Sequence, residues 1–153
     1  MRSCLVLVLC AAAACGTDDP APTVRVVSFT PDQLAPADDL ADDLRILVEY
    51  ADSDGDLGEG IARIDDCRGD MLRTELPIPA IAGEAMIGSP IRGSLDLFVN
   101  DVGAAASSAL PAVCDELGVA APGADETVFC VVLVDAAGHA GAGECTAPIA
   151  LAP

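Results

Sequence analysis

A short apolar run near the start of the chain constrains how the rest of it can fold. Residues 5–14 are uncharged and consist of Leu, Val, Ala and one Cys, and they follow Met1-Arg2-Ser3-Cys4. The run is shorter than the about 20 residues of a membrane-spanning helix and matches the hydrophobic region of an export signal. Ala12-Ala13-Ala14 supplies the small residues that signal cleavage requires. We therefore predict that residues 1–14 are removed and that the rest folds in an oxidising compartment.

The residues around this cleavage point resemble a known motif. Ala12-Ala13-Ala14-Cys15 is similar to the lipobox of bacterial lipoproteins, with Ala12 where that family prefers Leu. In that family the cysteine thiol receives a diacylglyceryl group, the signal is cut just before it, and the new amine is usually acylated. The resemblance covers residues 1–15 and implies that Cys15 anchors the chain to a membrane of the bacterial cell envelope. The alternative is ordinary cleavage after the alanines, which yields a soluble secreted protein.

Residue 16 bears on which membrane that would be. In enterobacterial lipoproteins, an Asp after the lipidated cysteine retains the protein at the inner membrane. Gly16 stands there in this chain, so the resemblance favours the outer membrane. Residues 15–22 then form a lipidated cysteine and a short polar tether, and residues 23–153 are long enough for one domain.

The composition of the chain limits both its core and its partners. Hydrophobic residues make up 52% and aromatic residues only 3%, so the core must be built from Val, Leu, Ile and Ala. The formal net charge is −18, and after removal of Arg2 it is −19, since 25 acids then face 6 arginines. A surface this negative repels phosphate backbones, which argues against nucleic-acid binding.

The cysteine count predicts disulfides. Two of the seven cysteines leave with the signal and Cys15 takes the lipid, so that four remain: Cys67, Cys114, Cys130 and Cys145. An even remainder in an exported chain points to two disulfides, although four cysteines allow three pairings. A hairpin of residues 127–134 and 143–151 around a loop at 136–139 would place Asp135 opposite Ala140 and Cys130 opposite Cys145, which favours Cys130–Cys145 with Cys67–Cys114. The competing zinc site is disfavoured because the cysteines form no closely spaced pair.

Alternation of apolar and polar residues predicts an all-β fold. Residues 44–50 alternate with Leu44, Ile46, Val48 and Tyr50 on one face, and residues 94–100 repeat this pattern. Residues 24–29 change phase between Val26 and Val27, which indicates a bulge. The other predicted strands are the central 127–134, the weaker 60–66 and 71–78, and 145–151. Pro77 and Pro79 indicate that the strand 71–78 lies at a sheet edge. An Ala-rich stretch near 107–117, with Pro111 inside it and Gly118 after it, predicts one short helix.

About seven short strands separated by Gly, Asp and Pro turns are typical of a single β-sandwich. The order resembles the immunoglobulin-like and fibronectin type III-like domains of bacterial surface proteins, and residues 131–139 are similar to their final hairpin. The resemblance covers about residues 22–153. The buried Trp and the tyrosine corner of antibody domains are absent, so antibody-type ancestry is not implied.

Asp52-Ser53-Asp54-Gly55-Asp56-Leu57-Gly58-Glu59 is the most specific patch of polar residues. Alternating aspartates on a tight loop point several carboxylates at one hard cation, so Asp52, Asp54, Asp56 and Glu59 are candidate Ca²⁺ ligands, with Asp101 or Asp135 as additions. The patch does not fit an EF-hand, because its sixth and twelfth positions are Leu57 and Arg63. It resembles the Asp-Gly-Asp turns of bacterial sandwich domains. The alternative is a plain turn in which Asp and Gly satisfy only the backbone.

No arrangement of residues in the sequence predicts catalysis. His139, the single histidine, lies in a Gly/Ala loop and is expected to face solvent without a catalytic role. The leading hypothesis is therefore a non-enzymatic, lipid-anchored envelope domain that is structural or binds a protein or glycan. A Ca²⁺-dependent adhesion or carbohydrate-binding module is the second hypothesis, and a hydrolase using clustered carboxylates is the third. Apart from Ca²⁺, no cofactor is expected.

Overall fold

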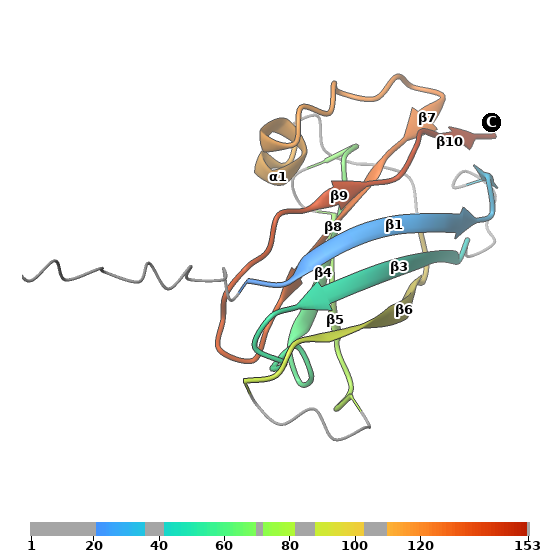
Figure 1. The fold of residues 1–153 in the computed structure, drawn as a ribbon. Coiled ribbons are helices and arrows are strands. Elements are labelled where there is room, and N and C mark those ends of the chain that lie inside the picture. The colour runs from blue at the N-terminus through green and yellow to red at the C-terminus, as the bar shows by residue number, and fades with distance from the viewer. Residues whose placement is uncertain (1–20, 36–41, 70–71, 82–87, 103–109, 153) are drawn as a thin grey trace, which may run out of the picture.

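Two antiparallel sheets face each other in the computed structural model, which describes residues 21–35, 42–69, 72–81, 88–102 and 110–152. The first sheet has the order β1-β3-β6, and these strands cross in front of the second in Figure 1. The second has the order β5-β4-β8-β9, and a small third sheet has the order β2-β10-β7. The strands are β1 (Thr23–Thr30), β2 (Gln33–Leu34), β3 (Leu44–Asp52), β4 (Ile61–Asp66), β5 (Arg73–Pro77), β6 (Ile91–Val99), β7 (Glu126–Thr127), β8 (Phe129–Val134), β9 (Glu144–Cys145) and β10 (Ile149–Leu151).

The first sheet confirms the alternation in the sequence. Leu44, Ile46 and Val48 are fully buried on the inner face of β3, while Arg45 and Glu49 point outward. The register between β1 and β3 shifts between Val26 and Ser28, so the predicted bulge is present and leaves Val27 exposed.

The second sheet has its central and edge strands where the sequence predicts, but the predicted strand 127–134 divides at Val128 into β7, in the third sheet, and β8. β8, the most continuously apolar strand, pairs with β4 on one side and β9 on the other, and is therefore central. β5 lies at the edge, where the missing N–H of Pro77 costs no ladder hydrogen bond. The inner faces of the two sheets meet in one core whose buried members are aliphatic apart from Phe129 and Tyr50, with Phe29 packed against it. The prediction of an all-β sandwich is thus confirmed.

The last predicted strand, residues 145–151, is wrong as one element. β9 ends at Cys145, and β10 begins at Ile149 in the third sheet, so the chain changes sheets over Thr146–Pro148. Pro148 cannot donate to a ladder. The Thr146 hydroxyl instead accepts a hydrogen bond from the Phe129 N–H at 3.1 Å, and the Thr146 N–H donates to the Phe129 carbonyl at 2.9 Å.

The predicted disulfide pairing is confirmed as Cys67–Cys114 and Cys130–Cys145. The sulfurs of Cys67, Cys114 and Cys130 also lie within 4.8 Å of one another, but a sulfur in a disulfide is not a thiolate ligand. Cys130 lies opposite Cys145 as counted from the hairpin. The turn itself differs by one residue, because Ala140 bridges to Val134 and not to Asp135. The two disulfides touch, with the Sγ atoms of Cys67 and Cys130 3.4 Å apart.

The helix α1 (Ala112–Glu116) is shorter than the predicted stretch. It begins after Pro111 and ends before Gly118, whose φ of +71° is suited to glycine. Residues 107–109 of the predicted helix lie outside the described residues, as do the signal segment and Cys15. Cys114 fastens α1 to the end of β4. Within the described part of the chain, we find no helix with the length and apolarity needed to cross a membrane.

Candidate metal centre

The loop between β3 and β4, at the lower end of the molecule in Figure 1, is built around two crowded glycines. Gly55 has φ +78°, and a Cβ there would lie 2.3 Å from the Ser89 carbonyl oxygen. At Gly60 a Cβ would lie 2.2 Å from the Val134 carbonyl oxygen. The loop therefore packs tightly between the segment before β6 and the end of β8. A Cβ atom at position 55 or 60 would collide with the neighbouring backbone, so both positions require glycine.

Only one of the two carboxylate oxygens of Asp52 makes a hydrogen bond that stabilises the turn. The residue is 2% exposed, and its Oδ2 accepts a hydrogen bond at 2.9 Å from the backbone N–H of Leu57, which is itself fully buried. Asp52 Oδ1 is closed to solvent and has no hydrogen-bond partner. A plain turn accounts for the first oxygen and leaves the second without a function.

Asp54 and Asp56 bring further oxygens to the same place. The three aspartates each offer a carboxylate oxygen within 4.8 Å of the others. Asp54 Oδ1 and Asp56 Oδ1 are also closed to solvent and unpartnered. Burial, followed by a side-chain hydrogen bond with Asp54, raises the pKa of Asp52 above its usual range, although hydrogen bonds to the Leu57 and Asp54 backbone act in the opposite direction. Burial also raises the pKa of Asp56, with the negative charge of Asp135 as the next cause.

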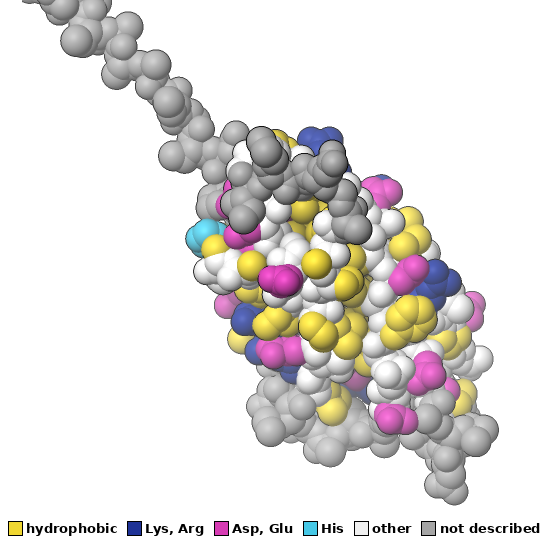
Figure 2. Space-filling view, turned by 90° about the horizontal axis from the view of Figure 1, so that it is seen from below, with side chains coloured by type: hydrophobic (Ala, Val, Ile, Leu, Met, Phe, Trp, Pro, Cys, Tyr) yellow, Lys and Arg dark blue, Asp and Glu magenta, His cyan; other side chains and the backbone are white. Residues whose placement is uncertain are grey.

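Asp135, directly after β8, adds a fourth carboxylate beside this group. It is 3% exposed, and His139 occupies both of its oxygens: the His139 backbone N–H donates to Oδ1 at 2.8 Å, and Nδ1 of the ring lies 3.0 Å from Oδ2. The Ala136 N–H donates to the Asp56 carbonyl at 3.1 Å, which ties this hairpin to the loop. Figure 2 shows acidic side chains beside the histidine on this face.

The expectation that His139 faces solvent is confirmed, since its side chain is 47% exposed. The ring also contacts Asp135, a contact that was not predicted, and holds it beside Asp56. The four-residue spacing of Asp135 and His139 around Gly138 was a signal for this contact, since a tight turn brings such a pair together.

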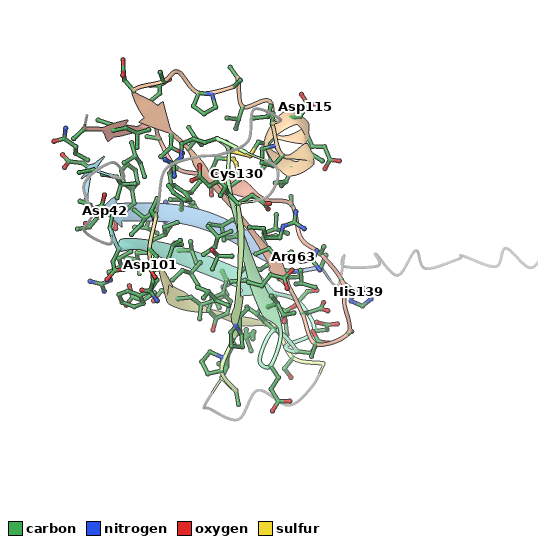
Figure 3. The ribbon with its side chains drawn as sticks, turned by 180° about the vertical axis from the view of Figure 1, so that it is seen from behind. Asp42, Arg63, Asp101, Asp115, Cys130 and His139 are labelled. Carbon is green, nitrogen blue, oxygen red and sulfur yellow. A yellow bond between two sulfur atoms is a disulfide. The ribbon has the colours of Figure 1, made fainter. Side chains whose placement is uncertain are left out.

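One predicted ligand, Glu59, and one predicted addition, Asp101, do not join the three aspartates. Glu59 is exposed and lies outside the group of three aspartates, and its backbone has φ +67°. Asp101 follows β6 at the far end of the sandwich, where Val99 pairs with Leu44. Figure 3 shows Asp101 at the opposite end from His139.

Asp42, shortly before β3, makes specific contacts with two other segments of the chain. The Asp42 carboxylate accepts a hydrogen bond from the Ala35 N–H, and its carbonyl accepts one from the Val102 N–H at 2.8 Å. Asp42 thus fastens loops at the end opposite the three aspartates.

Comparison of the whole chain with protein-family models finds no match, and comparisons with curated proteins and with solved structures likewise find no significant match.

Proposed function

We propose that the chain is an exported bacterial lipoprotein whose single β-sandwich domain is held at the cell envelope by lipid on Cys15 and has no catalytic role. The observation that carries this proposal is Ala12-Ala13-Ala14-Cys15 after a short apolar run. The disulfides support it, because both pairs lie among the four cysteines that follow Cys15. Cys15 is then the odd thiol of the processed chain and is available for the lipid.

The physical basis of the anchor is burial of hydrocarbon. Each buried CH₂ contributes about 0.8 kcal/mol, and two or three acyl chains hold a protein stably where one does so only marginally. Residues 16–22 separate the anchor from β1, which begins at Thr23. Seven extended residues reach about 25 Å, enough to lift the domain clear of the headgroups.

Intact-mass analysis of the membrane-extracted protein under non-reducing conditions tests the proposal. We expect a chain that begins at Cys15, carries the mass of the acyl groups and lacks four hydrogens for its two disulfides. Cys15→Ser is the matched control, because it removes the lipid site and leaves the domain unchanged. An unprocessed chain in the cytosol, with Met1 present and reduced thiols, would contradict the proposal.

A second candidate function is a Ca²⁺-dependent module that binds a glycan or a protein. The unpartnered oxygens of Asp52, Asp54 and Asp56 favour it over a purely structural domain. The same oxygens disfavour the hydrolase, because they are closed to solvent, and a sugar ring needs open access to both acids. Retention of the protein on envelope polysaccharide in Ca²⁺, and its release by a chelator, would support the module. Equal retention in both conditions would contradict it.

A further inference from the structure

We propose that Asp52, Asp54 and Asp56 form a binding site for one Ca²⁺ ion that closes the β3–β4 loop against the end of β8. This inference gives the second candidate function its ion and its ligands. It does not depend on the lipid anchor, because the three residues belong to the folded domain. Three properties of the loop support it: three oxygens lack partners, their spacing fits the ion, and no arginine ion pair of the described residues reaches them.

The first step is the missing partner. Asp52 is 2% exposed, its carboxylate lies among those of Asp54 and Asp56, and its Oδ1 has no hydrogen bond. Buried polar oxygens in folded proteins almost always have a partner, and a buried charge is normally paired or bound to a metal. The Leu57 N–H satisfies only Oδ2. A cation bound to Oδ1 supplies the partner that this oxygen lacks.

The second step is the spacing. The three ligand oxygens lie within 4.8 Å of one another. Ca²⁺ binds oxygen at about 2.3–2.6 Å, so one ion bridges oxygens up to about 5 Å apart, and this group lies within that limit. Mg²⁺ requires near-octahedral geometry and gives up its waters reluctantly, which suits an irregular group of carboxylates less well. Carboxylates are hard ligands that Ca²⁺ prefers, and the loop offers no nitrogen or sulfur ligand that would favour a transition metal.

The third step is the charge around the site. The arginine ion pairs among the described residues all join other acids, so none neutralises the three aspartates. Arg92 stands on β6 opposite Ala51, where its side chain is exposed, and His139 is engaged by Asp135. The site therefore concentrates negative charge that an ion can neutralise.

The number of ligands sets the expected affinity. Ca²⁺ takes six to eight oxygens, and three carboxylates supply three to six of them, so water or a bound partner must fill the remainder. Sites of this kind in extracellular modules have dissociation constants of about 10⁻⁴–10⁻³ M. At ten times that concentration, the ion should raise Tm by roughly 3–6 °C.

The composition of the chain offers a direct optical test. Tyr50 is the only tyrosine, there is no tryptophan, and the charge of Asp52 contributes to the raised pKa of the Tyr50 hydroxyl. Tb³⁺ replaces Ca²⁺ at oxygen sites and emits when a nearby tyrosine is excited. We would titrate Tb³⁺ into the full chain, purified in detergent from whole cells as the cell processes it, and then displace it with Ca²⁺ and with Mg²⁺.

We expect tyrosine-sensitised emission that Ca²⁺ displaces at lower concentration than Mg²⁺. Asp52→Asn, Asp54→Asn and Asp56→Asn should each weaken binding by about tenfold or more. Asp101→Asn is the matched control, because it removes the same charge at the opposite end, at a positive φ that asparagine tolerates. It should bind as the wild type does.

Three results would overturn the proposal: no sensitised emission, emission that Ca²⁺ does not displace, or equal binding by wild type and all three loop variants. Non-reducing mass and circular dichroism establish that each variant is folded. Calorimetric titration of the wild type with Ca²⁺ gives an answer that needs no variant, since absence of both heat and a Tm shift also rejects the site. Cys15→Ser should bind Ca²⁺ unchanged, which separates failure of this site from failure of the anchor.

Discussion

Buried aspartates occur in two places in this molecule, and their surroundings differ. At the end of β4, Asp66 accepts hydrogen bonds from the Arg68 side chain at 2.5–3.0 Å and from the Thr127 hydroxyl at 2.7 Å, while Asp65 pairs with Arg73 at 2.9 Å. At the other end of the sandwich, Asp52 receives one backbone N–H. Arginines of the chain neutralise Asp65 and Asp66, whereas no arginine ion pair of the described residues reaches Asp52.

The difference shows how a chain with few basic residues distributes them. Only six arginines follow the signal segment, and two of them neutralise the adjacent acids Asp65 and Asp66. The loop acids receive none, although Asp52 is as deeply buried as Asp65. A buried negative charge that the chain itself does not neutralise is best explained by an ion that binds from solution. Variants at the two aspartate sites test this contrast.

The largest effect should come from breaking the ion pair between Arg68 and Asp66. Arg68→Met leaves the buried Asp66 carboxylate without its cation and should cost about 3–5 kcal/mol of the free energy of unfolding. Urea denaturation of wild type and variant measures the difference. The double variant Arg68→Met with Asp66→Leu should recover most of it, because no unpaired charge remains. A loss below about 1 kcal/mol would mean that the two aspartate sites do not differ in this way.

The next largest loss of stability should come from removing the Cys67–Cys114 disulfide, which lies beside Asp66 at the end of β4. Replacing Cys67 and Cys114 by alanine should cost about 2–4 kcal/mol and loosen α1 from β4. The Ca²⁺-induced rise in Tm should persist in this variant, since the bridge lies at the other end of β4 from the loop. Loss of the Ca²⁺ response together with the bridge would show that the two ends are coupled, against the contrast drawn above.

Asp52→Asn should behave oppositely to Arg68→Met when Ca²⁺ is absent. It removes a buried charge that has no cation, so we expect no loss of stability, or a gain of up to about 1–2 kcal/mol. In saturating Ca²⁺ the order reverses, and the wild type becomes the more stable protein. Thermal melts with chelator and with Ca²⁺ measure both cases. A variant that is less stable than the wild type in chelator would show that the Asp52 charge is already compensated within the chain.

The pH dependence of the Ca²⁺-free protein should reveal the same acids. The pKa values of Asp52 and Asp56 are raised in the folded state, so the fold binds their protons more tightly than the unfolded chain does. The cost of burying these charges is present at neutral pH and is relieved as pH falls through the raised pKa values toward the ordinary 3.8. Tm in chelator should therefore rise between neutral pH and about 4.5, and it should rise less in Asp52→Asn. A monotonic fall in Tm over this interval, identical in both proteins, would contradict the assignment.

The sequence predicted what depends on nearest neighbours and failed where distant segments meet. Alternation located β3, and a phase change located the bulge at Val27, because both are properties of one strand. Counting along the hairpin paired Cys130 with Cys145 even though the turn was wrong by one residue. The sequence also marked the Asp52 loop as a candidate cation site.

The sequence could not show which oxygens of that loop are unpartnered. That depends on Ser89 and Val134, which pack against Gly55 and Gly60 from remote parts of the chain. The exclusion of Glu59 and the contact between Asp135 and His139 likewise follow from how the loop and the hairpin meet. The split between β9 and β10 depends on the third sheet, whose strands come from three separate segments.

The smallest effect should come from an exposed pair, which tests whether burial, and not charge alone, makes the two aspartate sites matter. Arg45 pairs with Asp96 at 2.8 Å on the outer face of the first sheet and lies 5.8 Å from the centre of the Phe98 ring. Both charged side chains are about half exposed, so water already compensates them and salt screens them. Arg45→Gln should therefore leave the urea midpoint within experimental error, in low salt and in high salt alike. A loss comparable to that of Arg68→Met would mean that unpaired charge destabilises this chain wherever it lies, and the uncompensated Asp52 would then lose its significance as a sign of a bound ion.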